Sequence, residues 1–270
     1  MHSADGRDNE GATVGADREP DYPSHLPEAG HVEPAPRRVR GRLQGVEIFD
    51  TTSAVYVWEQ RFYPQYYVPM IDVNGRALVP TGLAETDGQG TAELYELKAR
   101  GATRPRAAKH YTSSDLPAIA DTVRFDWDAI DEWLEEDERI FVHPRSPYVR
   151  VDAVRSRRHI RIRLKGVLLA DSQAPVMLYE TGLPTRYYVE RTALCFANLL
   201  PTSTVTECPY KGATSEYWSA VVNGGTHPDI AWSYGFPNYQ LSAIAGLVAF
   251  YNERVDIELD GVDLARPKRR

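Results

Sequence analysis

Arg42-Leu43-Gln44-Gly45-Val46 returns further along the chain as Arg163-Leu164-Lys165-Gly166-Val167, 121 residues later. The same offset relates Tyr66-Tyr67-Val68 to Tyr187-Tyr188-Val189. The offset then grows to 123 and 125, as three more pairs indicate: Tyr111 with Tyr234, Val123 with Val248, and Phe125 with Phe250. A recurrence at a nearly fixed spacing marks a repeated structural unit. The sequence therefore predicts one domain of about a hundred residues, duplicated, with two short insertions in the second copy.

Within each copy the pattern is mainly that of β-strands. Residues 159–164 alternate between apolar and charged side chains, which is typical of a half-exposed strand. The apolar run 217–222 leads into Asn223-Gly224-Gly225, a hairpin signal. Short helices are expected at 115–120 and 239–245. Residues 128–138 look helical by composition, but they match an alternating segment of the second copy, so we predict a strand in their first half.

The repeat sets the expected domain boundaries. Residues 1–36 carry scattered prolines and acids with few large apolar side chains, which predicts a disordered, acidic tail. Residues 37–144 form the first domain, 145–158 a linker and 159–267 the second domain. We expect two tandem, mainly β domains without structural zinc.

Composition excludes several classes of protein. The chain has 270 residues and a net charge of −7, which argues against nucleic-acid binding because phosphate contacts need a positive surface. Its two cysteines exclude a disulfide framework and an all-cysteine zinc site. No apolar run is long enough to span a membrane, and the N-terminus is too polar for a signal peptide. We expect a cytoplasmic protein with a small-molecule ligand and no cofactor, metal, nucleic-acid or membrane partner.

The densest chemistry is Cys208-Pro209-Tyr210-Lys211-Gly212. Cys208 is a candidate nucleophile with Lys211 as the activating cation, or else a small buried apolar residue. Glu180 ends a predicted strand before a Gly-Leu-Pro turn and is either a general acid or base, or a carboxylate that holds the turn, as its counterpart Glu59 would. The matching segment of the first copy, 86–90, reads as a flexible polar loop without thiol, phenol or amine.

Aromatic and basic residues of the second copy complete the candidate site. They are expected to line a ligand pocket or, alternatively, to form sheet core. Neighbouring Tyr187 and Tyr188 must point to opposite faces of their strand. The candidate ligand-binding residues are Arg186, Tyr187, Tyr210, Tyr217, Trp218, Trp232 and Tyr234. A run of arginines between Arg145 and Arg163 is interpreted as a solvated face balanced by the acidic residues 135–138, rather than as a phosphate site.

The second copy resembles the domain of unknown function 427 family. The resemblance is carried by residues 180–184, 186–188, 208–212, 217–218 and 231–234. It implies a β-tent (Mss4-like) fold, shared with methionine-R-sulfoxide reductases and the thalidomide-binding domain of cereblon. Many such relatives hold zinc on paired Cys-x-x-Cys knuckles, which this sequence lacks. A nucleotidyltransferase label is also attached to the family, but no closely spaced pair of metal-binding acids follows a Gly-Ser start here.

Two functions remain open from the sequence. One is a small-molecule binding module in the second domain. The other is a thiol- or carboxylate-dependent enzyme that uses Cys208, Glu180 and Lys211. An exposed Cys208 beside a charged partner favours the enzyme, whereas an open aromatic cage favours binding.

Overall fold

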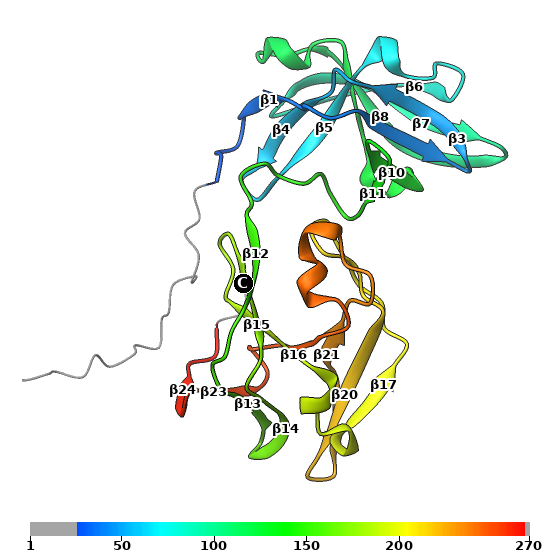
Figure 1. Cartoon of the computed structure of the whole chain (residues 1–270). Coiled ribbons are helices and arrows are strands. Elements are labelled where there is room, and N and C mark those ends of the chain that lie inside the picture. Colours follow the sequence, from blue (N-terminus) through cyan, green and yellow to red (C-terminus); the bar gives the residue numbers. More distant parts are fainter. Residues whose placement is uncertain (1–25, 268–270) are drawn as a thin grey trace, which may run out of the picture.

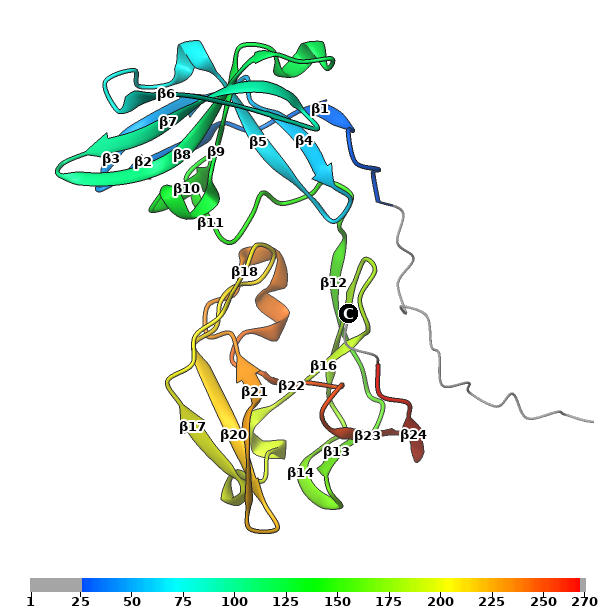
Figure 2. The same ribbon diagram turned by 180° about the vertical axis from the view of Figure 1, so that it is seen from behind.

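The computed structural model describes residues 26–267, so most of the predicted N-terminal tail lies outside the described residues. Figures 1 and 2 show two sheet-rich halves that follow one another along the chain. Each half contains one seven-stranded and one four-stranded sheet, and all their strand pairs are antiparallel.

The first half, as described from residue 26 to residue 140, comprises eleven strands and three short 3₁₀ helices. The strands are β1 (Val32–Pro34), β2 (Val39–Leu43), β3 (Val46–Thr51), β4 (Val55–Gln60), β5 (Tyr63–Pro69), β6 (Leu78–Asp87), β7 (Gly90–Ala99), β8 (Ala102–Ser113), β9 (Thr122–Phe125), β10 (Glu132–Glu135) and β11 (Glu138–Ile140). The helices are η1 (Met70–Asp72), η2 (Pro117–Ile119) and η3 (Trp127–Ala129).

The second half repeats this plan and adds one small sheet. Its strands are β12 (Val151–Arg155), β13 (Ile160–Leu164), β14 (Val167–Ser172), β15 (Val176–Glu180), β16 (Arg186–Val189), β17 (Leu199–Thr202), β18 (Glu207–Cys208), β19 (Gly212–Ala213), β20 (Glu216–Val222), β21 (Gly225–Ser233), β22 (Val248–Phe250), β23 (Asp256–Leu259) and β24 (Val262–Leu264). Its 3₁₀ helices are η4 (Arg191–Ala193), η5 (Phe196–Asn198) and η6 (Tyr239–Ile244).

The strand orders of the two halves match position for position. The large sheets run β1-β4-β5-β9-β8-β7-β6 and β12-β15-β16-β22-β21-β20-β17, and the small ones β11-β10-β2-β3 and β24-β23-β13-β14. The segments 119–125 and 244–250 occupy equivalent places, each joining the end of a 3₁₀ helix to the strand that follows it. The predicted fold class is thus confirmed in its β content and its duplication.

Most strands lie where the sequence pattern predicts them, and the differences have local causes. The strand expected in the first half of 128–138 forms later, as β10, because residues 127–129 make the turn η3. Val32–Pro34, within the predicted tail, pairs with β4 as an edge strand. Val151–Arg155, within the predicted linker, pairs in the same way with β15. Both edge strands are too short and too polar to be distinguished from loop by periodicity.

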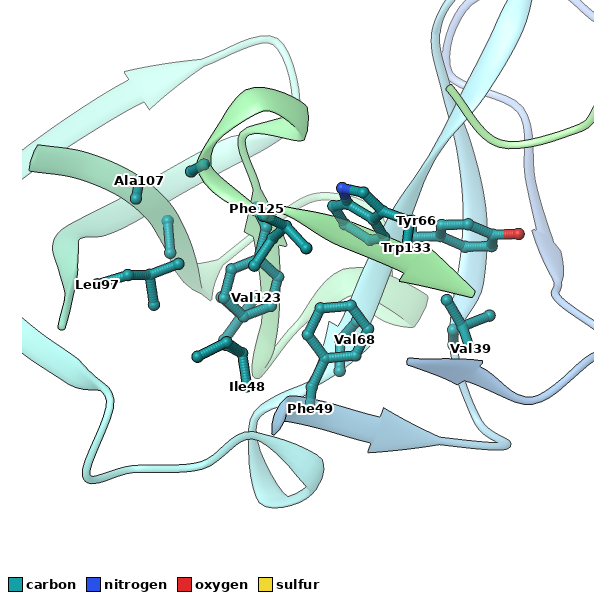
Figure 3. Packing of buried hydrophobic residues seen from close by; sticks show 14 of the residues in the cluster. Val39, Ile48, Phe49, Tyr66, Val68, Leu97, Ala107, Val123, Phe125 and Trp133 are labelled. Atoms are coloured by element: carbon teal, nitrogen blue, oxygen red, sulfur yellow. The ribbon is translucent and has the colours of Figure 1, made fainter. Parts of the chain in front are cut away.

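Each half buries its main core between its two sheets. Figure 3 shows the first of these cores, where the ring of Phe49 stacks on Phe125 with centroids 5.0 Å apart and lies 5.3 Å from Trp133. Gly41 faces Phe49 across the β2–β3 pair, and a Cβ atom at Gly41 would lie only 2.3 Å from that ring. The second half has Ile162 opposite Ala170 at the same positions. The two copies therefore fill this layer with opposite combinations of small and large side chains.

Candidate functional site

One face of the second seven-stranded sheet carries a row of side chains in register. Val176 lies opposite Tyr188, Tyr188 opposite Ala249, Ala249 opposite Trp232, and Trp232 opposite Tyr217. These residues pack together with Tyr234, Leu241 and Ile244 in a cluster that is separate from the main core of the domain. We call this surface of the sheet the aromatic face.

The segment between strands β17 and β20, residues 203–215, covers the aromatic face. Strand β17 ends at Thr202, and the chain forms the small β18–β19 hairpin, which carries the Cys208–Gly212 motif, before it re-enters the sheet at β20. Asn238 fixes this hairpin, since its side-chain amide donates to the carbonyls of Pro209 and Tyr210 and its backbone N–H donates to that of Lys211. Figure 2 shows the hairpin beside η6, the helix that begins after Asn238.

Lys211 and Glu180 form a buried ion pair at the centre of the site. The Nζ atom of Lys211 lies 2.5 Å from Glu180 Oε2, and the two residues expose only 8% and 7% of their surfaces. The same Nζ lies 3.6 Å from the Sγ atom of half-buried Cys208. Burial disfavours the ammonium, but the Glu180 carboxylate and the Cys208 and Tyr188 side chains more than offset that cost, so the pKa of Lys211 is raised. Lys211 therefore stays protonated and serves as a fixed positive charge.

Tyrosine side chains enclose this charge cluster. Burial raises the pKa of Tyr188 to about 12, and burial with the nearby Glu180 carboxylate also raises the pKa values of Tyr210 and Tyr234. The Tyr188 hydroxyl is buried and has no hydrogen-bond partner among residues 26–267. The Tyr210 hydroxyl accepts a 3.0 Å hydrogen bond from the backbone N–H of Ser146, which ties the motif to the segment between the two domains.

A pocket of about 510 Å³ opens next to the aromatic face. It is lined by Arg186, Thr204, Thr206, Tyr217, Asp229, Tyr251, Glu253 and Arg254. The hydroxyls of Tyr217 and Tyr251 lie 3.0 Å apart, and the Tyr251 ring lies 4.4 Å from that of Trp232 beneath it. The Arg186 guanidinium binds both oxygens of Glu253, at 2.8 and 2.6 Å, and lies over Trp232 and Tyr251.

The predicted site residues thus fall into three groups. The first group is the buried ion pair of Glu180 and Lys211, with Cys208, Tyr210 and Tyr234 around it. Arg186 and Tyr217 line the neighbouring pocket, and Trp232 packs beneath it. Tyr187 and Trp218 lie in the main core on the opposite face of the sheet, which differs from the expectation that Trp218 and Trp232 share a pocket. The cause is strand alternation, since Trp218 directly follows Tyr217 on β20.

Sequence reasoning missed the residues after β22. Tyr251, Glu253 and Arg254 form half of the pocket's charged and aromatic lining. In the first half the matching positions, 125 residues earlier, hold Asp126, Asp128 and Ala129. No motif surrounds this turn. The difference between the two copies at these positions is the one signal in the sequence that could have pointed to the three residues.

The sequence of each half also matches a known domain. A sequence model described as domain of unknown function (DUF427) matches residues 31–136 and, a second time, residues 152–261. The chain belongs to the DUF427 family. Each half is one DUF427 copy, as the internal repeat predicts. A comparison with curated proteins finds no match. Among residues 26–267, no helix is both long enough and apolar enough to cross a membrane.

The first DUF427 copy contains a polar network of its own at the equivalent place. Residues 86–90, expected to be a flexible loop, form the end of the long β6–β7 hairpin. Asp87 accepts hydrogen bonds from Lys109 Nζ at 3.0 Å and from the Tyr111 hydroxyl at 2.8 Å. Lys109 also pairs with Glu85 at 2.8 Å. The expectation of a featureless loop is thus wrong, because phenol and amine partners come from the neighbouring strand β8.

Charged side chains of the first DUF427 copy occupy the positions that shape the pocket in the second. Arg124 and Lys109 stand in the register positions of Ala249 and Trp232. Arg124 Nε binds Glu59 Oε1 at 3.1 Å, and the Tyr67 hydroxyl donates to the same oxygen at 2.9 Å. Both copies therefore pair this carboxylate with a cation, although the cation comes from strand β9 in one and from the Cys208–Gly212 motif in the other.

Metal ligation receives no support from the side-chain geometry. Among residues 26–267, no three His, Cys, Asp or Glu side chains are grouped so as to hold a metal ion. The prediction that the fold needs no zinc stays a prediction that elemental analysis of the purified protein would test.

Proposed function

We propose that the second DUF427 copy binds a planar, polar small molecule in the pocket beside Tyr251. The observation that carries the proposal is the pocket's combination of size and lining. Its volume of about 510 Å³ falls within the range of sites for small organic ligands, roughly 300–1,000 Å³. Its lining combines two aromatic rings, Tyr217 and Tyr251, with two arginines and two carboxylates.

The lining residues indicate which chemical groups such a ligand needs. Tyr251, supported from below by Trp232, presents an aromatic surface on which a flat molecule can stack. Thr204 and Thr206 supply hydroxyls that donate or accept, and Arg186 and Arg254 supply only donors. Asp229 already accepts hydrogen bonds from Thr202 and Thr204, and Glu253 from Arg186, so N–H or O–H groups of a ligand would use the remaining lone pairs of these carboxylates. A ring system with both donors and acceptors at its edge fits this set.

The internal duplication supports a role specific to the second copy. The counterparts of Arg186, Tyr217 and Tyr251 in the first copy are Gln65, Leu94 and Asp126. None of these three provides the same chemistry. A residue kept only for the shared fold would be expected in both copies.

The test is a thermal-shift screen with planar heteroaromatic compounds, because a ligand that binds only the folded state raises the melting temperature. Tyr251→Ala should abolish the shift produced by any hit. Asp126→Ala, the same change at the matching position of the first copy, should leave it intact. A hit that stabilises Tyr251→Ala as much as the unaltered protein would contradict the proposal.

A second candidate function is chemistry at the Cys208 thiol. It rests on the half-buried Sγ atom lying 3.6 Å from the protonated Lys211 amine, since nucleophilic cysteines are characteristically found beside cations. Cys195 is also half-buried and is the matched control. If this candidate holds, iodoacetamide should alkylate Cys208, followed in Cys195→Ser protein, several times faster than Cys195 in Cys208→Ser protein. Equal rates would dismiss it.

A further inference from the structure

A second cavity lies beside η6. It has a volume of about 710 Å³ and is bounded by the end of β12, the start of β15 and η6 with the turn that follows it. Its lining divides into an apolar part and a polar part. The apolar residues are Ala174, Val176, Ala243, Ala245 and Leu247, and the polar residues are Arg155, Ser156, Arg157 and Ser242. It shares no lining residue with the pocket beside Tyr251.

Not every arginine between Arg145 and Arg163 forms an ion pair with an acidic residue of the described part of the chain. Most of these arginines have acidic partners, although only Arg145 pairs with the run 135–138 that was expected to balance them: Arg145 pairs with Glu135, Arg150 with Asp152, Arg158 with Asp260, Arg161 with Asp171 and Glu258, and Arg163 with Glu258. Arg155 and Arg157 form no ion pair with any residue between 26 and 267. They are the two arginines that line the cavity.

The first DUF427 copy has no such pair of cations. By register, Arg155 lies opposite Val176 as Pro34 lies opposite Val55 in the first copy, and Arg157 accordingly corresponds to Pro36. The next residue, Arg158, corresponds to Arg37, which is bonded to Glu135. The fold therefore forms this corner without guanidinium groups, and the two free arginines are additions of the second copy.

We propose that this cavity binds a small amphiphilic oxyanion, a carboxylate or phosphate monoester attached to a short apolar group. Guanidinium groups bind carboxylate and phosphate oxygens through paired hydrogen bonds, and Ser156 and Ser242 add hydroxyl donors. The apolar group lies on Val176, Ala245 and Leu247. Within the described part of the chain, residues 26–267, no acidic side chain lines the cavity. Because the whole protein carries a net charge of −7, general electrostatic attraction does not favour anions, so binding has to come from this local arrangement.

The experiment compares phenyl phosphate, hexanoate and inorganic phosphate on the full chain, at constant ionic strength set with sodium chloride. Calorimetric titration gives the affinities, and thermal shift reports on the unliganded variants. We expect phenyl phosphate or hexanoate to bind more tightly than inorganic phosphate. Arg155→Gln and Arg157→Gln should each weaken that binding about tenfold or more, the loss expected for a charge-assisted hydrogen bond.

Arg158→Gln is the matched control. It removes the same charge from the same segment but does not line the cavity, so the affinity should stay within about twofold of the unaltered protein. Binding of phenyl phosphate alone identifies a phosphate ester, and binding of hexanoate alone a carboxylate; both outcomes support the proposal. It is overturned if neither probe binds, if inorganic phosphate binds as tightly as both, or if Arg158→Gln weakens binding as much as Arg155→Gln does.

Discussion

At the scale of single residues, Lys211 combines two demands that the sequence alone does not reconcile. Its long charged side chain belongs to a residue type that is mostly exposed, yet its ammonium is buried against Glu180. Lysine and glutamate are almost never fully buried unless they are paired. Each of the two buried charges therefore needs the other as its counter-ion. The pair has a structural role whether or not the cluster also takes part in chemistry.

Removing one partner should accordingly destabilise the domain. Lys211→Met leaves the Glu180 carboxylate buried without a counter-ion, so we expect the free energy of unfolding to fall by about 3–5 kcal/mol. Urea denaturation measures the change. The double variant Lys211→Met with Glu180→Gln should be less destabilised than Lys211→Met alone, because no unpaired charge remains. A loss below about 1 kcal/mol for Lys211→Met, the range of exposed ion pairs, would show that water reaches the pair.

At the scale of secondary-structure elements, the two copies have the same strand pairs but differ in which strand of a pair carries the large side chain. The β2–β3 pair holds Gly41 against Phe49, and the β13–β14 pair holds Ile162 against Ala170. The summed side-chain volume of the two facing residues is similar in both copies, although the volume at each single position differs. This is how a close-packed layer can diverge without a change of backbone.

This exchange predicts a compensating double variant. Gly41→Ala places a methyl group 2.3 Å from the Phe49 ring and should destabilise the first copy by about 1–3 kcal/mol. Phe49→Ala leaves a cavity and should cost about 3–5 kcal/mol. Gly41→Ile combined with Phe49→Ala imitates the second copy, so its loss, measured in urea, should be clearly smaller than that of Phe49→Ala. A loss as large as the sum of the separate effects of Gly41→Ile and Phe49→Ala would contradict the compensation.

How much the sequence predicts also differs between elements. The repeat predicts the topology, because residues such as Gln44-Gly45 and Lys165-Gly166 occupy the same left-handed turns in both copies. It predicts that Glu180, Cys208 and Lys211 gather, but not that Trp218 turns away from them. Tyr217 and Trp218 are neighbours on β20 and so point to opposite faces, but which of the two faces carries the site follows from the packing of the sheet and not from the motif. The 251–254 turn carries no periodic signal at all.

At the scale of the whole molecule, the two domains are joined by a segment that touches both. His143 stacks on Tyr63 of the first domain with centroids 3.9 Å apart, and its ring edge faces Tyr210 of the second at 6.2 Å. Burial lowers the pKa of His143, although the carbonyl of Pro144 and the Glu180 carboxylate oppose the shift. The connection between the domains is therefore sensitive to protonation.

The sign of the pH dependence follows from this shift. Because the folded-state pKa of His143 is below the ordinary value of 6.5, the unfolded chain binds the proton first as the pH falls. The contribution of His143 to stability is complete above that value and is lost progressively below it. His143→Phe keeps an aromatic ring without a titrating group. Its free energy of unfolding should fall less than that of the unaltered protein between about pH 7.5 and about pH 5.5. Parallel pH profiles for the two proteins would refute this.

The anchoring of the β18–β19 hairpin has a kinetic consequence. Asn238 holds the hairpin on one side and Ser146 on the other, and Thr204 and Thr206, at its entrance, line the pocket beside Tyr251. A wall that is already fixed does not have to order itself when a ligand arrives. Association should then be a single step, with an observed rate that rises linearly with ligand concentration and does not level off at the rate of a conformational change.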